Sequence, residues 1–314
     1  MTEKILLFGG SGLLGSELRR LFEREGIAYA APAHSQADCR DALMIRAILR
    51  SVRPTHVILA AARVGGILAN QRRGAEFMFY NALMNLVTLQ ACAEEGVDQA
   101  MLFGASCMYP KGIDRPIRED DLLTGPIEES NIGYAVGKLA AVKYAELLSR
   151  EGRCRTTVCI PTNLYGDEDH FDPDEGHLIA SLIPKMHRAK EEQAEEIRLW
   201  GDGTPRRDFL HAQDAARACL AVLRAQPSEI YVNIGSGYDR TVREIAEKTA
   251  QAVGFQGRLL FSGQIGNGTN RKLLETSRIR ALGWHPEVSL EEGLQNAYRS
   301  YLKQQEQKLV TKES

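Results

Sequence analysis

The chain has 314 residues, 44% of them hydrophobic and 25% charged, and a formal net charge of −2. This composition is ordinary for a soluble globular protein of two lobes or two domains, and it gives no electrostatic case for nucleic acid or an anionic membrane as a partner. The sequence has no signal peptide, no apolar run of about 18 residues and six scattered cysteines without a CxxC pair. We therefore expect a cytoplasmic protein with free thiols and no metal site.

The first half of the chain alternates apolar runs with segments of helical periodicity. Residues 4–26 begin as a buried strand, turn at glycines and continue as a helix. Further strands are predicted at 55–66, 99–110 and 154–166, and further helices at 77–96 and 134–152. Strands that alternate with helices indicate an α/β fold with a doubly wound, parallel, Rossmann-type sheet.

The second half is less regular and predicts a smaller α/β lobe. Strands are expected at 195–203 and 229–237 and helices at 242–254 and 289–303, and the polar tail after Tyr301 is expected to fray. We place a first domain at residues 1–165 and a second at 166–314, with residues 206–237 returning to the first.

Glycines at a strand–helix junction point to a dinucleotide site in the first domain. Gly9, Gly12 and Gly15 form a GxxGxxG loop, whose backbone can approach a pyrophosphate at the helix N-terminus. The residues between and beside them, Ser11, Leu13 and Leu14, belong to the same cofactor-binding loop.

The end of the second strand bears on the choice of cofactor. An acidic residue there binds the ribose hydroxyls of NAD, but this chain has Ala33, His34 and Ser35 in that region. The missing carboxylate favours NADP(H), although that turn has no arginine either.

Tyr134 and Lys138 lie four residues apart on one predicted helix, so their side chains can meet. A nearby ammonium lowers the pKa of a phenol, which makes the phenol a usable proton donor and acceptor for a carbonyl–alcohol pair. Together with the glycine loop, this pair predicts a nicotinamide-dependent enzyme.

Several motifs carry a resemblance to the extended short-chain dehydrogenase/reductases, and more closely to the GDP-L-fucose synthases. They are "GGSGLLG", "LAAARVGGILAN", "GASCMYP", "NIGYAVGK", "PTNLYG", "HLI", "WGDGTPRRDFLH", "NIGSG" and "RKLLETSRIRALGW". The resemblance implies a reaction in two steps at one site: epimerisation at C3 and C5 of a GDP-4-keto-6-deoxymannose, then hydride delivery from NADPH to C4. It also implies a GDP-sugar as substrate and a homodimer formed through a helix bundle.

The resemblance assigns Cys107 and His177 to the two proton transfers of the epimerisation, and Tyr134 with Lys138 to the reduction. In the family a serine or threonine four residues before the tyrosine of "SCMYP" binds the 4-keto oxygen. Here that position is Ala105, and Ser106 follows it. Either the strand end presents Ser106, which we keep as a candidate catalytic residue, or Tyr134 holds the carbonyl alone.

Other residues match binding positions of the family. Asp38 and Cys39 would contact the adenine, and Asn163, His177 and Lys138 would lie at the nicotinamide end of the cofactor. The GDP-sugar would be bound by Lys185, Trp200, Arg207 and Lys272. The ammonium and guanidinium groups of the three cations suit its diphosphate, and Trp200 would pack on the substrate.

Three different functions remain compatible with the residues alone. The first is that of a related GDP-4-keto-sugar reductase, of colitose type or without epimerisation. The second is that of a sugar-nucleotide epimerase or dehydratase that retains NAD and shows no net consumption of NADPH. The third is that of an NADP-binding regulator without catalysis, which the retained Tyr134 and Lys138 disfavour.

Overall fold

A six-stranded parallel sheet forms the first lobe. The computed structural model describes residues 3–263 and 269–313. In the order in which they pair, the strands are β2 (Tyr29–Ala30), β1 (Ile5–Phe8), β3 (His56–Leu59), β4 (Gln99–Phe103), β5 (Arg155–Pro161) and β9 (Tyr231–Ile234). The strand order reverses direction between β1 and β3, where open α/β sheets bind their ligands. The doubly wound α/β fold predicted from the sequence is thereby confirmed.

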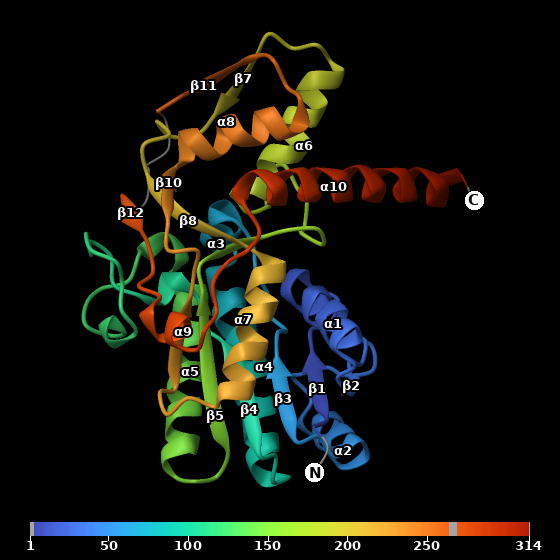
Figure 1. The fold of residues 1–314 in the computed structure, drawn as a ribbon, viewed down its shortest axis with the longest axis vertical. Helices are drawn as coiled ribbons and strands as arrows, with labels where there is room; N and C mark the ends of the chain where they lie inside the picture. The colour runs from blue at the N-terminus through green and yellow to red at the C-terminus, as the bar shows by residue number, and fades with distance from the viewer. Residues whose placement is uncertain (1–2, 264–268, 314) are drawn as a thin grey trace.

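Helices cover both faces of this sheet (Figure 1). Successive side chains of a strand point to opposite faces: Ile5 and Leu7 lie in one core, and Leu6 and Phe8 in the other. The first core is completed by α1 (Leu13–Glu25) and α7 (Ala212–Ala225), and the second by α2 (Ala42–Val52), α4 (Gly74–Glu94) and α5 (Ile132–Arg150).

The second lobe has two small sheets and a third hydrophobic core. One sheet pairs β10 (Asp239–Thr241), β8 (Arg206–His211) and β12 (Arg271–Lys272), with β6 (Asn163–Tyr165) also on β8, and the other pairs β7 (Glu196–Leu199) with β11 (Arg258–Phe261). The core lies between these strands and α6 (Leu178–Glu191), α8 (Val242–Val253) and α10 (Leu290–Glu313).

Short helices complete the chain. They are α3 (Ile67–Arg72), α9 (Ser277–Ala281) and the 3₁₀ turns η1 (Ser106–Met108), η2 (Glu119–Asp121) and η3 (Glu129–Asn131). The chain passes between the lobes more than once, because α7 and β9 join the first sheet whereas β8 pairs with strands of the second lobe. The division at residue 165 and the return of residues 206–237 stay predictions.

Several predicted bounds differ from the structure. The strand predicted at 99–110 ends at Phe103 and is followed by η1, and the one predicted at 154–166 divides into β5 and β6, which join different sheets. Helix α6, which contains Pro184, was not predicted from the sequence. The tail does not fray after Tyr301: α10 continues to Glu313, since its Lys, Gln and Glu residues are good helix formers.

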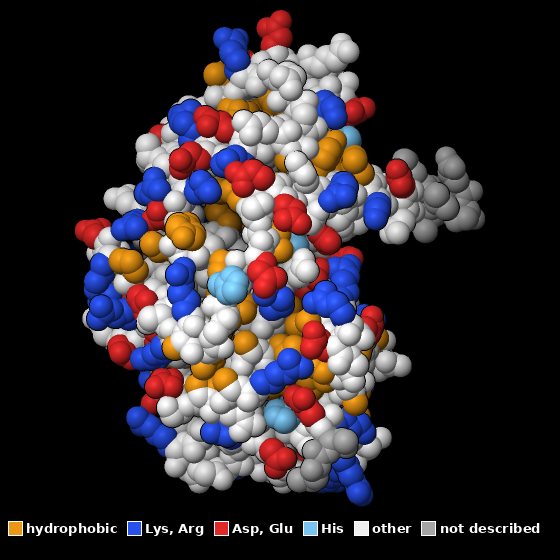
Figure 2. All heavy atoms as spheres, viewed as in Figure 1, with side chains coloured by type: hydrophobic (Ala, Val, Ile, Leu, Met, Phe, Trp, Pro, Cys, Tyr) orange, Lys and Arg blue, Asp and Glu red, His pale blue; other side chains and the backbone are white. Residues whose placement is uncertain are grey.

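The surface is mixed in charge on the face drawn in Figure 2, where basic and acidic side chains are interspersed and α10 projects from the body. This agrees with the near-zero net charge of the sequence. Within residues 3–263 and 269–313, no helix has both the length and the apolar character needed to cross a bilayer.

Candidate active site

The glycine loop forms a cradle that side chains would block. Gly9 has φ +82°, and a Cβ on it would lie 2.4 Å from the backbone nitrogen of Ala61, just beyond β3. A Cβ on Gly15 would lie 2.0 Å from the carbonyl oxygen of Gly9. Gly12 begins α1 without a side-chain cap, so the helix N-terminus faces the loop with its amide donors. The loop therefore fits the diphosphate of a dinucleotide.

Tyr134 and Lys138 meet as predicted on α5. The ammonium of Lys138 lies 6.0 Å from the centre of the Tyr134 ring. Burial lowers the pKa of Lys138 to about 8. The predicted lowering of the Tyr134 pKa is wrong for the chain without bound cofactor. Burial raises the pKa of Tyr134 above its usual value, and the nearby Cys107 adds to the effect. Tyr134 is therefore protonated at neutral pH and can act as a proton donor.

Cys107 lies beside this pair, at η1. Burial raises the pKa of its thiol, while the positive charges of Lys272 and Lys138 act in the opposite direction. Cys107 as a whole residue is half-buried. Cys107, Tyr134, Lys138 and Lys272 thus come together from three elements that are far apart in the sequence.

Exposure differs among the residues that follow β4. Ala105 and Cys107 are half-buried, whereas Ser106 and Met108 are buried, with Ser106 only 9% exposed. Ala105 has an extended backbone, and Ser106–Met108 form the 3₁₀ turn η1 in place of the predicted strand. The role of Ser106 as a carbonyl-binding residue stays a prediction.

Cations predicted to bind the substrate lie next to the same cluster. Burial lowers the pKa values of Lys272 and Arg207, which also repel each other, and the carboxylate of Glu128 opposes both shifts. Glu128 accepts a hydrogen bond from Thr269 at 3.1 Å. An anion bound here would relieve the repulsion between the two cations.

Glu128 was not among the residues predicted from the sequence. It stands just before η3, far in the chain from Arg207 and Lys272, and nothing in its local sequence distinguishes it from a surface acid. The pairing of β12 with β8 places Lys272 opposite Arg207, and the charge of Glu128 acts on both cations from a third segment of the chain.

His177 occupies a different segment, at the N-terminus of α6. His177 keeps an exposed surface, yet desolvation by the surrounding protein lowers the pKa of its imidazole. The preceding residues are tied to the first lobe: Gly66 donates its amide to the carbonyl of Glu175 at 2.8 Å, and Arg73 pairs with the Glu175 carboxylate at 2.8 Å. The pairing of His177 with Cys107 stays a prediction.

Lys185 and Trp200 contact each other in the second lobe. The Lys185 ammonium lies 5.0 Å above the Trp200 ring, and Trp200 is 48% exposed. An exposed aromatic face beside a cation suits a nucleotide, although their role in binding stays a prediction. Asn163 donates its side-chain amide to the carbonyl of Asp208 at 2.8 Å.

The two residues predicted to contact adenine, Asp38 and Cys39, differ in charge and burial. Asp38 is held by two hydrogen bonds from the Arg40 guanidinium, which lower its pKa to about 2. The thiol of Cys39 is buried in the core, with its pKa raised to about 11. An adenine could therefore reach the backbone of Cys39 more easily than its side chain.

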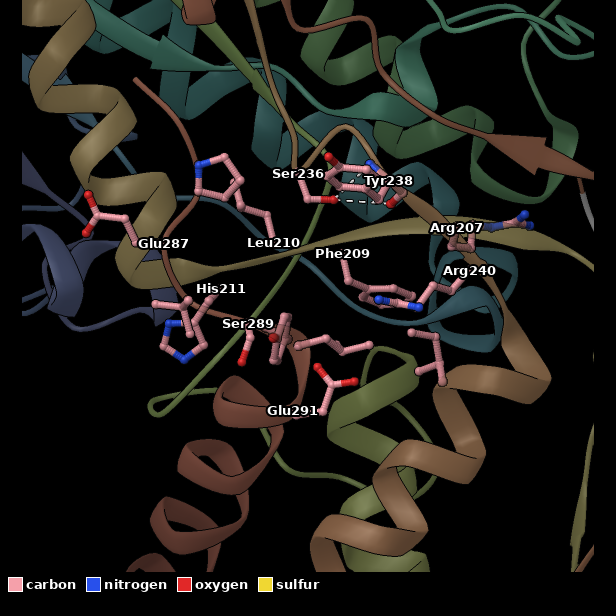
Figure 3. A pocket seen from close by; sticks show the side chains of 15 residues that line it. Arg207, Phe209, Leu210, His211, Ser236, Tyr238, Arg240, Glu287, Ser289 and Glu291 are labelled. Atoms are coloured by element: carbon pink, nitrogen blue, oxygen red, sulfur yellow. Dashed lines mark hydrogen bonds between the residues drawn. The ribbon is translucent and has the colours of Figure 1, made fainter. Parts of the chain in front are cut away.

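A separate cavity of about 260 Å³ lies between β8, β10 and the start of α10 (Figure 3). Of the predicted site residues, Arg207 alone lines it, and its side chain extends away from the other lining side chains in the view of Figure 3. The catalytic candidates Cys107, Tyr134, Lys138 and His177 are thus not among the residues that line this cavity. Among the described residues, no group of acids, histidines and cysteines is arranged to hold a metal ion.

Comparison with known proteins identifies the family. A model of the NAD dependent epimerase/dehydratase family matches residues 5–235, which span the glycine loop, η1, the Tyr134–Lys138 pair and β9. The chain belongs to this family. Membership in the NAD dependent epimerase/dehydratase family accounts for the cradle formed by Gly9, Gly12 and Gly15.

Individual relatives are similar over nearly their whole length. GDP-L-fucose synthase of Escherichia coli (strain K12) is 36% identical over 97% of this chain and 98% of its own. GDP-L-colitose synthase of Yersinia pseudotuberculosis is 32% identical over 95% of this chain and 98% of its own. The crystal structure of a GDP-L-fucose synthetase from Naegleria fowleri bound to NADP has a TM-score of 0.86 at 26% identity and covers 97% of this chain and 95% of that one. The resemblance seen in the motifs is confirmed.

Proposed function

We propose that the chain converts GDP-4-keto-6-deoxy-D-mannose to GDP-L-fucose, by epimerisation at C3 and C5 and NADPH-dependent reduction at C4. The observation that carries the proposal is the cluster of Cys107, Tyr134 and Lys138 beside the cations Lys272 and Arg207. The full-length similarity to the synthase of Escherichia coli supports the choice of substrate, and the NADP bound to the Naegleria fowleri enzyme supports the cofactor.

In this proposal, the pKa directions support a division of the two proton transfers of the epimerisation between His177 and Cys107. The lowered pKa of His177 keeps its imidazole neutral, so His177 removes a proton from C3 or C5, which the 4-keto group acidifies. The raised pKa of Cys107 keeps its thiol protonated, so Cys107 delivers a proton to the opposite face of the same carbon. Exchange of both groups with solvent restores them for the second carbon.

The reduction uses the Tyr134–Lys138 pair. NADPH, when bound in the cradle of Gly9, Gly12 and Gly15, supplies the hydride to C4. Tyr134 donates its phenolic proton to the oxygen of C4, and the ammonium of Lys138 stabilises the phenolate that remains. Lys272 and Arg207 hold the diphosphate of the substrate, which keeps the sugar ring against Cys107.

The test is product NMR after incubation with NADPH and GDP-4-keto-6-deoxy-D-mannose in deuterated water. We expect GDP-L-fucose labelled at C3 and C5, with one NADPH consumed for each product. Cys107→Ser and His177→Asn should lose the exchange while still binding the GDP-sugar. A wild-type protein that neither exchanges these protons nor oxidises NADPH would overturn the proposal.

A second candidate is reduction of a related GDP-4-keto sugar. The 32% identity to the colitose synthase of Yersinia pseudotuberculosis is the observation that favours it. Faster turnover of a 3-deoxy substrate than of the 3-hydroxy sugar would select it. Net NADPH oxidation with either sugar would exclude the epimerase or dehydratase that retains NAD, as well as the regulator without catalysis.

We also propose that the protein is a homodimer in the cytoplasm. The outer surface of α4 and α5 exposes large apolar side chains: Met78, Phe79, Ile132 and Leu147 are each at least 40% exposed. A second copy of the same two helices would cover them. All six cysteines are free, as expected in a reducing compartment.

A further inference from the structure

The stem of Arg19 lies over the glycine loop. A Cβ built on Gly10 would stand 3.2 Å from Cδ of Arg19 and 3.0 Å from Cβ of Ala31. Ala31 directly follows β2, and Arg19 lies on the second turn of α1. Because side chains of a helix point back toward its N-terminus, the Arg19 guanidinium is carried toward the space between the loop and the end of β2.

This guanidinium is exposed and unpaired. In residues 3–263 and 269–313, Arg19 makes neither an ion pair nor a side-chain hydrogen bond. The acid one turn further along α1 is Glu23, which instead accepts a hydrogen bond from the Tyr29 hydroxyl at 2.6 Å. A free cation at the mouth of the cradle can take an anion without first breaking a contact.

Two other arginines of the first lobe are already paired with acids. Arg40 makes a bidentate contact with Asp38, and Arg63 pairs with Glu76. The turn after β2, which includes Ala33, His34 and Ser35, is exposed and has no carboxylate. The position of an acid that would bind a ribose diol is thus neutral, and a free guanidinium stands beside it.

We propose that Arg19 binds the 2′-phosphate of NADP(H) and sets the preference for NADP(H) over NAD(H). The inference rests on the cofactor of the proposed function. A guanidinium can hold a phosphate through two parallel hydrogen bonds, whereas the 2′-hydroxyl of NAD offers it no charge. The arginine missing from the turn after β2 is supplied in space by α1.

The experiment measures dissociation constants for NADPH and NADH by nicotinamide fluorescence, without any sugar. Arg19→Ala should weaken NADPH binding roughly ten- to hundredfold, the range of a charged hydrogen-bonded contact, and change NADH binding less than about twofold. Arg19→Lys should recover part of the loss. The dissociation constant of adenosine 2′,5′-bisphosphate, obtained from competition with NADPH, should rise in Arg19→Ala by a factor similar to that of NADPH, while the dissociation constant of ADP stays unchanged.

Two further variants separate Arg19 from its neighbours. Arg24→Ala removes an exposed arginine from the last turn of the same helix and should leave both constants unchanged. Arg40→Ala removes another exposed guanidinium, from the segment between β2 and α2, and should leave the NADPH to NADH ratio within about twofold of the wild type. An unchanged ratio in Arg19→Ala, or an equal loss in Arg40→Ala, would overturn the inference.

The outcome is independent of turnover. A wild type that binds NADPH but does not convert the GDP-sugar would defeat the proposed function and leave the assignment of Arg19 standing. If the wild type converts the sugar but Arg19→Ala does not change the cofactor preference, the proposed function stands and the assignment of Arg19 fails.

Discussion

Ala105 is the residue at which the chain departs from the motif of the GDP-L-fucose synthases. Its neighbour Ser106 is buried, whereas Ala105 shares the half-open exposure of Cys107. A hydroxyl at position 105 would stand at a half-buried position two residues before Cys107, where the wild-type chain has only a methyl group. In the proposed reaction, Tyr134 is then the candidate that binds the 4-keto oxygen.

We expect Ala105→Ser to raise the rate of C4 reduction by about tenfold. Loss of a single oxyanion donor costs other enzymes roughly 10²–10³ in turnover, and a restored donor in an unadapted site should recover only part of that. The rate of NADPH oxidation with saturating GDP-sugar measures the effect. Ser106→Ala serves as the control and should change the rate little; a severe loss in that variant would show that Ser106 binds the carbonyl.

Lys138 gives a second expectation at this scale. Burial lowers its pKa to about 8, whereas the unfolded chain keeps the ammonium to about pH 10.4. Between these values the unfolded state binds more protons, so stability should rise with pH; below about pH 8 the buried charge destabilises the fold fully.

Lys138→Met should therefore raise the melting temperature at pH 7 and abolish reduction. A gain on the order of 1–3 kcal/mol is expected, and it should shrink toward pH 10. Differential scanning calorimetry at pH 7 and pH 10 measures the gain in stability and its decrease with pH. A variant less stable than the wild type at pH 7 would show that the Lys138 ammonium is stabilised by its neighbours.

At the scale of elements, the segment that carries His177 is tied to the first lobe at two points. Gly66 approaches Gly176 so closely that a Cβ on Gly66 would lie 2.7 Å from the Gly176 carbonyl oxygen. The Arg73–Glu175 ion pair holds the same segment from the start of α4. These contacts set where α6 begins, and with it the position of His177.

We expect Arg73→Ala and Glu175→Ala each to slow the C3/C5 exchange two- to fivefold, because a partly exposed ion pair contributes only about 0.2–1 kcal/mol. NADPH binding should stay unchanged. The charge swap Arg73→Glu with Glu175→Arg should restore the exchange rate measured by NMR. If the swap is slower than either single variant, the pair does not position His177.

At the scale of the whole molecule, the outer surface of α4 and α5 is the proposed dimer interface. The two helices pack closely because Gly133 and Gly137 have no side chain: a Cβ on Gly137 would lie 2.7 Å from the carbonyl oxygen of Met78. Their outward side chains Phe79 and Leu147 are 59% and 50% exposed.

Phe79→Asp with Leu147→Asp should convert the dimer to a monomer, because a charge would be buried in an apolar interface. Light scattering after size-exclusion chromatography gives the mass directly. Leu43→Asp is the matched control, since Leu43 is 78% exposed on α2 and should leave the mass unchanged. A wild-type protein that is already monomeric would refute the homodimer.

The sequence by itself determined the features that depend on neighbours in the chain. Apolar runs at β1 and β4, the glycine loop and the four-residue spacing of Tyr134 and Lys138 are local patterns, and each was placed correctly on its strand, turn or helix. Helix α6 was not predicted, because Pro184 interrupts its local pattern. Packing in the third hydrophobic core stabilises the helix despite this proline.

The tertiary structure decided what depends on distant segments. Lys272 lies beside Arg207 only through the pairing of β12 with β8, and Glu128 acts on both cations from a third segment. The stem of Arg19 on α1 and the side chain of Ala31 after β2 both lie next to Gly10. The protonation of Tyr134 and Lys138 followed from burial, which outweighed the charge that spacing alone predicted. Burial and the contacts between distant strands arise from the packing of the whole chain, so no local pattern encodes them.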